Sequence, residues 1–244
     1  MIEITDLHKS FNGNAVLQGL NLSIPDGKIT VIIGPSGCGK TVLLRHMIGL
    51  LQPDRGRVMV DRVNLSALDR VQMNAFRGRF GMLFQQAALF DSMNVFENVA
   101  FPLREHTQKT DGEIQKIVAE KLALVGLTGT ETKMPSELSG GMRKRVGLAR
   151  AIALQPKIIL YDEPTTGLDP IMTEAIDNLI LETQRKMNVT SVVISHDIPS
   201  SFRIADQISM VYKGRIVESG TAEAFRNSKH EAVQEFIRKG EGKG

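Results

Sequence analysis

The sequence predicts an α/β fold with an antiparallel β layer near its start and a helical subdomain inserted into its core. Two observations carry this prediction. Short apolar runs with the length of buried strands alternate with helical segments towards both ends of the chain, whereas residues 86–155 show little strand signal. A glycine-rich turn at residues 34–41 joins one apolar run directly to a helix.

Length and charge limit the classes of function. The 244 residues can bury a substantial core, and we expect one domain over residues 1–240 with a flexible tail at 241–244. Apolar content of 42% and charged content of 23% are ordinary for a globular protein. A net charge of +3, without a dense block of Lys and Arg among aromatic residues, argues against nucleic acid as a partner.

Cysteine usage and hydropathy indicate the compartment. The single cysteine, Cys38, excludes an internal disulfide and favours a reducing environment. No apolar stretch approaches the roughly 18 residues that span a bilayer. Residues 1–5 lack the basic-then-apolar layout of a signal peptide. We therefore expect a cytoplasmic protein whose work on a membrane goes through another chain.

The elements follow in order. Apolar bursts from Ile2 to about Thr30, separated by turn signals, predict the antiparallel β layer, which residues 57–60 join. Further along, helical spacing and buried runs predict the remaining elements. They are helices at 42–48, 113–125, 143–154, 173–187 and 231–237, and strands at 29–33, 158–161, 191–194 and 208–212.

Residues 34–41 fit G-x-x-x-x-G-K-[ST], the pattern of a phosphate-binding P-loop. The glycines let successive N–H groups point inward, and the N-terminus of the following helix adds partial positive charge. Lys40 would reach the β- and γ-phosphates, and the Thr41 hydroxyl would bind Mg²⁺. The alternative is a glycine-rich surface turn. The expected nucleotide-binding residues here are Gly34, Pro35, Ser36, Gly37, Cys38, Gly39, Lys40 and Thr41.

Cys38 lies beside Lys40 at the predicted helix N-terminus, where the pKa of a thiol is often lowered. We expect alkylation of this thiol to inactivate the protein and ATP to protect it. The alternative is an inert small residue.

Polar side chains follow three of the apolar runs, at the edge where open α/β sheets bind ligands. Asp162 would orient Mg²⁺, and Glu163 would polarise a water that attacks the γ-phosphate; the alternative is two solvated acids. His196 would sense or stabilise the γ-phosphate, against the alternative of a structural histidine. Gln85, after residues 82–84, could reach the metal or the water.

Ser139-Gly140-Gly141 opens the predicted helix at 143–154 and so forms a second anion-binding N-terminus. The alternative is an ordinary helix cap. A second phosphate site in one chain makes sense if it serves a nucleotide bound to another copy.

Taken together, these motifs resemble the ATPases of ABC transporters over essentially the whole chain. The matching pieces are the P-loop, Gln85, Leu138-Ser139-Gly140-Gly141, Asp162-Glu163, the turn Gly167-Leu168-Asp169 and His196, in that order. The resemblance implies a P-loop NTPase fold with a RecA-like core. It places the α/β core and β subdomain at 1–85 and 156–225, and the helical subdomain at 86–155.

The family resemblance also implies a mechanism. Two copies pair head to tail, and each ATP lies between the P-loop of one copy and the LSGG segment of the other. Ser139, Gly140 and Gly141 would then contact the partner's ATP, and Asp169 would cross the dimer. Phe11 would stack on adenine, with a core phenylalanine as the alternative. The implied Mg²⁺ ligands are Thr41, Gln85 and Asp162, and the implied catalytic residues are Glu163, His196 and Gln85.

Two positions depart from the commoner family pattern. Phe11 stands where tyrosine is commoner, which should be neutral because stacking needs only the ring. Met142 replaces the glutamine of LSGGQ, which leaves the phosphate contacts intact but removes the amide hydrogen bond that glutamine could make.

A narrower likeness lies in residues 90–107 and 134–142, which resemble the ATPase of Mla/Mce-type transporters. It implies phospholipid transport between bacterial membranes, of the type that keeps the outer membrane asymmetric, from the cytoplasmic face of the inner membrane. The implied partners are an MlaE-like permease, an MlaD-like MCE protein and often an MlaB-like STAS-domain subunit. Alternatives are an ABC ATPase for another cargo such as amino acids or lipoproteins, a non-transport ABC ATPase, and a nucleotide-gated scaffold.

Overall fold

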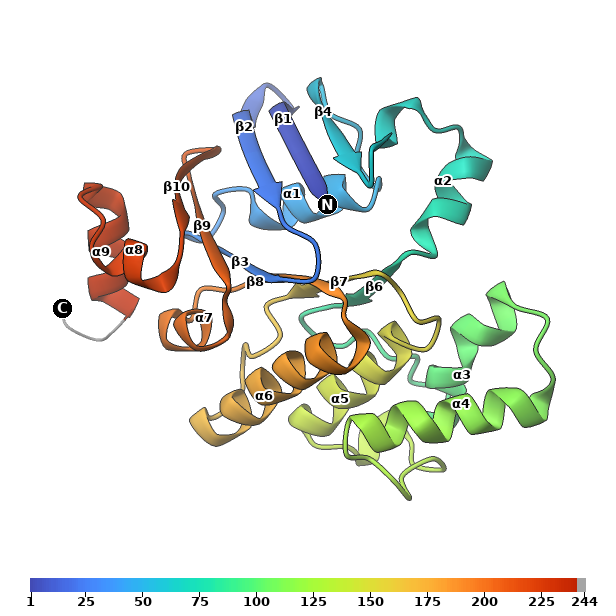
Figure 1. Cartoon of the computed structure of the whole chain (residues 1–244). Helices are drawn as coiled ribbons and strands as arrows, with labels where there is room; N and C mark the ends of the chain where they lie inside the picture. Colours follow the sequence, from blue (N-terminus) through green and yellow to red (C-terminus); the bar gives the residue numbers. More distant parts are fainter. Residues whose placement is uncertain (241–244) are drawn as a thin grey trace. The chain divides into compact units, whose positions relative to one another are not determined.

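The computed structural model describes residues 1–240, which form two compact units (Figure 1). The first unit contains Met1–Arg77 and the described part of Thr190–Gly244, and the second contains Gly78–Val189. The tail expected at 241–244 lies outside the described residues.

The antiparallel β layer belongs to the first unit. Its strands follow the order β2-β1-β4-β5, as the apolar bursts predicted. Ile2 and Ile4 of β1 are buried and alternate with exposed residues, and Leu7 is buried after a register shift, as in a sheet with one face on the core. Figure 1 shows α1 running across this layer. The strands are β1 (Ile2–Phe11), β2 (Asn14–Ile24), β4 (Arg55–Val60) and β5 (Val63–Asn64).

A second set of strands in the first unit surrounds β3 (Ile29–Ile33). It pairs in parallel with β8 (Thr190–Ile194) on one side and with β9 (Gln207–Tyr212) on the other. All five residues of β3 are buried, as expected for a parallel strand with neighbours on both edges. The strand β10 (Arg215–Gly220) pairs antiparallel with β9.

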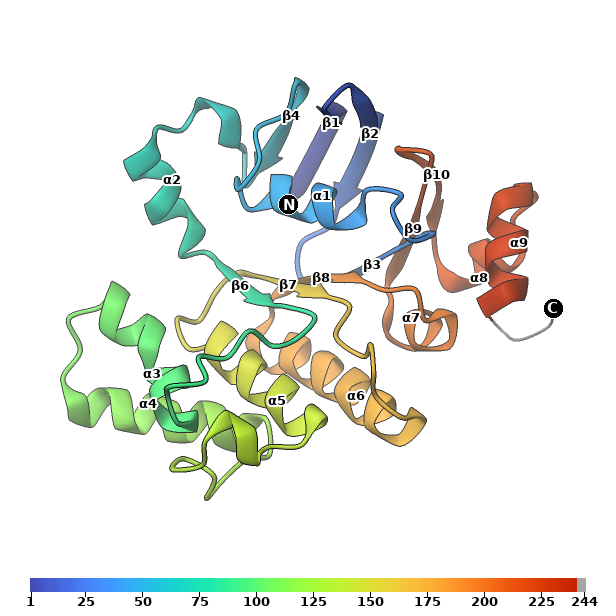
Figure 2. The same ribbon diagram turned by 180° about the vertical axis from the view of Figure 1, so that it is seen from behind.

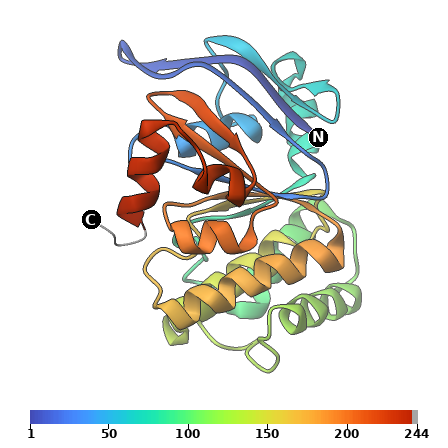
Figure 3. The same ribbon diagram turned by 60° about the vertical axis from the view of Figure 1, so that its left-hand side comes forward.

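The helices of the first unit follow turns or strand ends. Figure 3 shows α8 and α9 together at the end of the described chain, and α8 packs on β10. The amphipathic helix expected at 231–237 is three residues longer in the structure. The elements are α1 (Lys40–Met47), a 3₁₀ turn at Leu65–Ala67, α2 (Arg70–Arg77), α7 (Ile198–Ile204), α8 (Ala222–Arg226) and α9 (Glu231–Gly240).

The second unit combines two parallel strands with four α-helices and a 3₁₀ turn. The strands β6 (Phe80–Leu83) and β7 (Ile158–Asp162) pair with Leu83 opposite Tyr161. Figure 2, the view from behind, shows α3, α4 and α5 as neighbours, with α6 beside α5. The helices are α3 (Val95–His106), α4 (Asp111–Leu124), α5 (Gly140–Ala151) and α6 (Pro170–Met187), and the turn is Pro135–Glu137.

This second unit extends beyond the helical segment expected at 86–155, because β6 and α6 both pack on α5. The helix α3 was not predicted from spacing, since Pro102 interrupts the pattern of a helix interior. Its start is nevertheless strongly specified: Asn94 and Glu97 form a reciprocal capping box.

Candidate functional site

The P-loop of the first unit follows β3 directly and ends where α1 begins at Lys40. Its first residue, Gly34, has φ of 149°, and a Cβ there would overlap the main-chain oxygen of Val211 in β9. A side chain at this position would therefore displace backbone, which explains the glycine. The strand–loop–helix context predicted for this motif is confirmed.

The ammonium group of Lys40 lies over the P-loop. The Lys40 side chain is only 7% exposed, and Nζ donates to the main-chain oxygens of Gly34 at 2.7 Å and Pro35 at 2.9 Å. Thr41 follows on the exposed side of the first helical turn, and Ser36 and Gly37 are also exposed. A buried ammonium group and a helix N-terminus at one loop suit a polyanionic ligand.

The expectation of a lowered pKa for the Cys38 thiol is wrong. Burial raises the pKa of the Cys38 thiol, and this effect exceeds the lowering by the Lys40 ammonium. The thiolate loses water contacts in the folded loop, so proximity to a cation and a helix N-terminus does not suffice to stabilise it.

Two more predicted residues belong to the first unit. Phe11 ends β1 with 41% of its surface exposed, which excludes the alternative of a core phenylalanine. The Lys9 ammonium lies 5.6 Å from the centre of the Phe11 ring.

His196 is exposed just past β8. Because β8 runs parallel to β3, with Ile194 opposite Ile32, His196 lies at the same strand edge as the P-loop.

In the second unit, the structure joins Gln85 to Glu163. The Gln85 Nε2 donates to Glu163 Oε2 at 3.2 Å, and the Thr166 hydroxyl donates to the same oxygen at 2.9 Å. The pairing of β6 with β7 brings the two segments together. Glu163 adopts φ of 47°, an uncommon conformation for a residue other than glycine. Asp162 is the last residue of β7.

The segment Ser139-Gly140-Gly141 forms the start of α5, three residues before the predicted helix. Ser139 is the N-cap, and its Oγ accepts from the Met142 N–H at 3.3 Å. Asp169 caps α6 in the same way, accepting from the Met172 N–H at 2.9 Å. Both caps therefore have a local structural role, whatever else they contact.

Lys144 and Thr166 were not identified from the sequence. Lys144, in α5, is 6% exposed and donates from Nζ to the main-chain oxygens of Gln85 and, at 3.4 Å, of Glu163. Burial lowers its pKa, against the opposing influence of the Glu163 and Asp162 carboxylates. The spacing of residues 141, 144 and 148 on one helix face was the available signal of its burial.

The three expected Mg²⁺ ligands offer a hydroxyl, an amide oxygen and a carboxylate, a donor set of hard oxygens that fits this ion. Thr41 belongs to the first unit, and Gln85 and Asp162 belong to the second. Within residues 1–240, no three or more His, Cys, Asp or Glu side chains cluster as metal ligands would.

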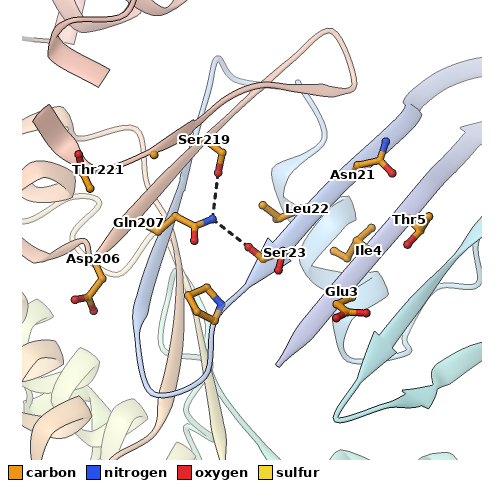
Figure 4. Close-up of a pocket in the computed structure, with 12 residues that line it drawn as sticks. Glu3, Ile4, Thr5, Asn21, Leu22, Ser23, Asp206, Gln207, Ser219 and Thr221 are labelled. Carbon is orange, nitrogen blue, oxygen red and sulfur yellow. Dashed lines mark hydrogen bonds between the residues drawn. The ribbon is translucent and has the colours of Figure 1, made fainter. Parts of the chain in front are cut away.

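Each unit also carries a groove. In the first unit, a groove of about 750 Å³ lies at the amino ends of the parallel strands, at the opposite edge from the P-loop. Gln207 spans it, donating to the main-chain oxygen of Ser23 and the hydroxyl of Ser219 (Figure 4). In the second unit, a groove of about 610 Å³ is lined by residues that include Gln85, Lys144 and Gly140.

The model of the family described as "ABC transporter" matches residues 17–166. The chain belongs to the ABC transporter family. This ABC ATPase is 44% identical over 97% of its length to the "Intermembrane phospholipid transport system ATP-binding protein MlaF" of Escherichia coli, and covers 88% of that protein. It is equally identical, at 44% over 97% of its length, to the "Probable ribonucleotide transport ATP-binding protein mkl" of Mycobacterium bovis, but covers only 66% of it.

A solved structure agrees with this membership. The ABC ATPase superposes on the ATP-binding cassette MJ0796, a dimer bound to ADP and Pi, with a TM-score of 0.83 and 30% identity. The match covers 91% of this chain and 99% of that one. The predicted P-loop NTPase fold is thereby confirmed. Among residues 1–240, no helix combines the length and the apolar character needed to cross a bilayer.

Proposed function

We propose that this ABC ATPase hydrolyses ATP to drive phospholipid transport between bacterial membranes through a separate permease. The observation that carries the proposal is the 44% identity to MlaF, which extends over nearly the full length of both chains. The predicted likeness of residues 90–107 and 134–142 to Mla/Mce-type ATPases points the same way. Membrane work would take place at the cytoplasmic face of the inner membrane.

Two copies of the chain complete each site. Ser139, Gly140 and Gly141 of one copy meet the ATP held by the P-loop of the other, and Asp169 reaches across the dimer. The dimeric form of the MJ0796 cassette supports this arrangement. The helical subdomain at 86–155 transmits closure of the dimer to the permease.

Each site residue then has a role. N–H groups from Ser36 onward and the Lys40 ammonium hold the phosphates, while Phe11 stacks on adenine. Thr41, Gln85 and Asp162 would hold Mg²⁺, which supplies positive charge to the phosphate oxygens when bound.

The hydrolytic residues act on the attacking water. Glu163 accepts its proton, and the hydrogen bond from Gln85 orients the Glu163 carboxylate. His196 donates to the γ-phosphate from the strand edge that also carries the P-loop. Once the γ-phosphate is released, the two copies separate.

The proposed partners follow from the cargo. They are an MlaE-like permease, an MlaD-like MCE protein and an MlaB-like STAS-domain subunit. Purifying the tagged chain from membranes of its own bacterium and identifying the bound proteins by mass spectrometry tests this set. Recovery of a permease and an MCE protein supports the proposal, whereas a permease of another cargo class refutes it.

Ribonucleotide transport is a second candidate, because relatives with that name are equally identical. The purified complex, reconstituted in vesicles, separates the two cargoes. Phospholipid transport predicts ATP-dependent transfer of a fluorescent phospholipid to acceptor vesicles, lost in Lys40→Ala. ATP-dependent movement of a labelled ribonucleotide without lipid transfer would favour the second candidate.

A further inference from the structure

The buried Lys144 contacts both segments that carry the hydrolytic pair. Its Nζ donates to the main-chain oxygen of Gln85 and to that of Glu163, at 3.4 Å for the latter. The side chains of the same two residues are joined by the Gln85–Glu163 hydrogen bond of 3.2 Å. One ammonium group thus links the backbones of two residues whose side chains must meet.

Burying an ammonium group costs free energy unless hydrogen bonds compensate the loss of water. Another buried lysine, Lys121 in α4, is 4% exposed and donates to the exposed Glu120 carboxylate at 2.8 Å. Lys144 instead donates to main-chain oxygens in segments 59 and 19 residues away. Its hydrogen bonds therefore constrain loop backbone rather than pair two side chains.

The helix that carries Lys144 also packs closely against the strand before Gln85. A Cβ at Gly147 of α5 would lie 2.8 Å from Leu83 Cδ1 and 3.1 Å from Ala87 Cβ. A Cβ at Gly81 of β6 would overlap the main-chain oxygen of Ala151 at the end of α5. Helix and strand therefore pack at close range where these two glycines lie.

We propose that Lys144 is a positioning residue that fixes the backbone of Gln85 and Glu163 relative to α5, the helix that Ser139 caps. The hydrolytic pair of one chain is thereby held beside the helix whose N-terminus contacts the other chain's ATP. This inference rests on the proposed ATPase function and adds a coupling between the two half-sites of one protomer.

Hydrogen exchange on the full nucleotide-free chain tests the positioning role without any turnover. Lys144→Met keeps the length and apolar stem of the side chain but removes its donors. We expect amide exchange of residues 84–88 and 163–167 to rise together by at least about fivefold, because both segments lose the same anchor. The matched control, Lys121→Met, leaves both segments within about twofold of the parent. No change, or a rise that includes α4 as well, overturns the proposal.

Kinetics of the assembled complex give a second test. In Lys144→Met, we expect kcat to fall by about tenfold or more, with KM for ATP within about threefold, since the P-loop is untouched. Lys144→Gln retains N–H donors and recovers part of the kcat. An unchanged kcat, or equal kcat in the Met and Gln variants, contradicts the proposal. If the parent complex hydrolyses no more ATP than Lys40→Ala, the proposed function fails, and the exchange result alone decides the role of Lys144.

Discussion

Replacing Asn98 with alanine should destabilise the second unit strongly. Asn98 is fully buried in α3. Its Oδ1 accepts from the Phe90 N–H at 2.9 Å, and its Nδ2 donates to the main-chain oxygens of Phe90 at 3.1 Å, Met93 at 2.9 Å and Asn94 at 3.1 Å. This one side chain therefore ties the segment before α3 to the helix.

The magnitude follows from the groups left without partners. The oxygens of Phe90 and Asn94 keep other acceptor bonds, to the N–H groups of Met93 and Asn98. The Phe90 N–H and the Met93 oxygen lose the bonds that Asn98 supplies. These hydrogen bonds are only partly buried, so the lower half of the range of about 1–3 kcal/mol for each unsatisfied group applies. The expected loss is about 3 kcal/mol for the two groups, or about 6–12 °C in Tm for a chain of this size.

Differential scanning calorimetry of the full chain measures this change. The control is Asn74→Ala, at an exposed position in α2 where the side chain accepts a single hydrogen bond, from Arg77. We expect the control to shift Tm by less than about 2 °C. A shift that small in Asn98→Ala would refute the assignment of these hydrogen bonds as essential to the segment.

Four further predictions follow. Glu163→Gln should lower phosphate release by about a hundredfold or more while ATP still binds and holds the dimer closed, because only the proton acceptor is lost; release above a tenth of the parent rate argues against the role. Lys40→Ala should weaken ATP binding by about 10- to 150-fold in a fluorescent-nucleotide titration, and a Kd within threefold would contradict it. Burial lowers the pKa of His46, so the folded state resists a proton that the unfolded chain accepts near pH 6.5. Stability should therefore fall as the pH drops from 7.5 to 5.5, by at most about 1.4 kcal/mol per pH unit, and denaturant titration should show a flatter profile in His46→Gln. Because burial raises the pKa of Cys38, iodoacetamide at pH 7 should label it more slowly than it labels glutathione, as mass spectrometry can show; faster labelling would restore the original expectation.

The sequence predicted best the parts where local pattern and tertiary packing agree. The β-branched run before Gly34 is buried as a parallel strand, and the P-loop follows it as the motif requires. Ser139 caps α5, as the interpretation of Ser139-Gly140-Gly141 as a helix opening implied, although α5 and α6 each begin three residues before the predicted 143 and 173.

Other features depend on contacts that no local pattern contains. The pKa of Cys38 was predicted in the wrong direction, because the argument from the helix N-terminus left out burial. Ala87, Ala88 and Glu163 adopt positive φ although their residue types disfavour it, so tertiary contacts impose the conformation. The role of Lys144 required knowing that Gln85 and Glu163 lie beside α5, which the separation along the chain conceals.

The close packing of β6 and α5, which Gly81 and Gly147 permit, has a consequence for experiments on motion. A hinge cannot lie inside this block, because bending there would press main chain against main chain. A pair of spectroscopic labels, one on β6 and one on α5, should therefore keep a constant separation through the whole ATP cycle. That separation provides a fixed reference distance for labels placed elsewhere.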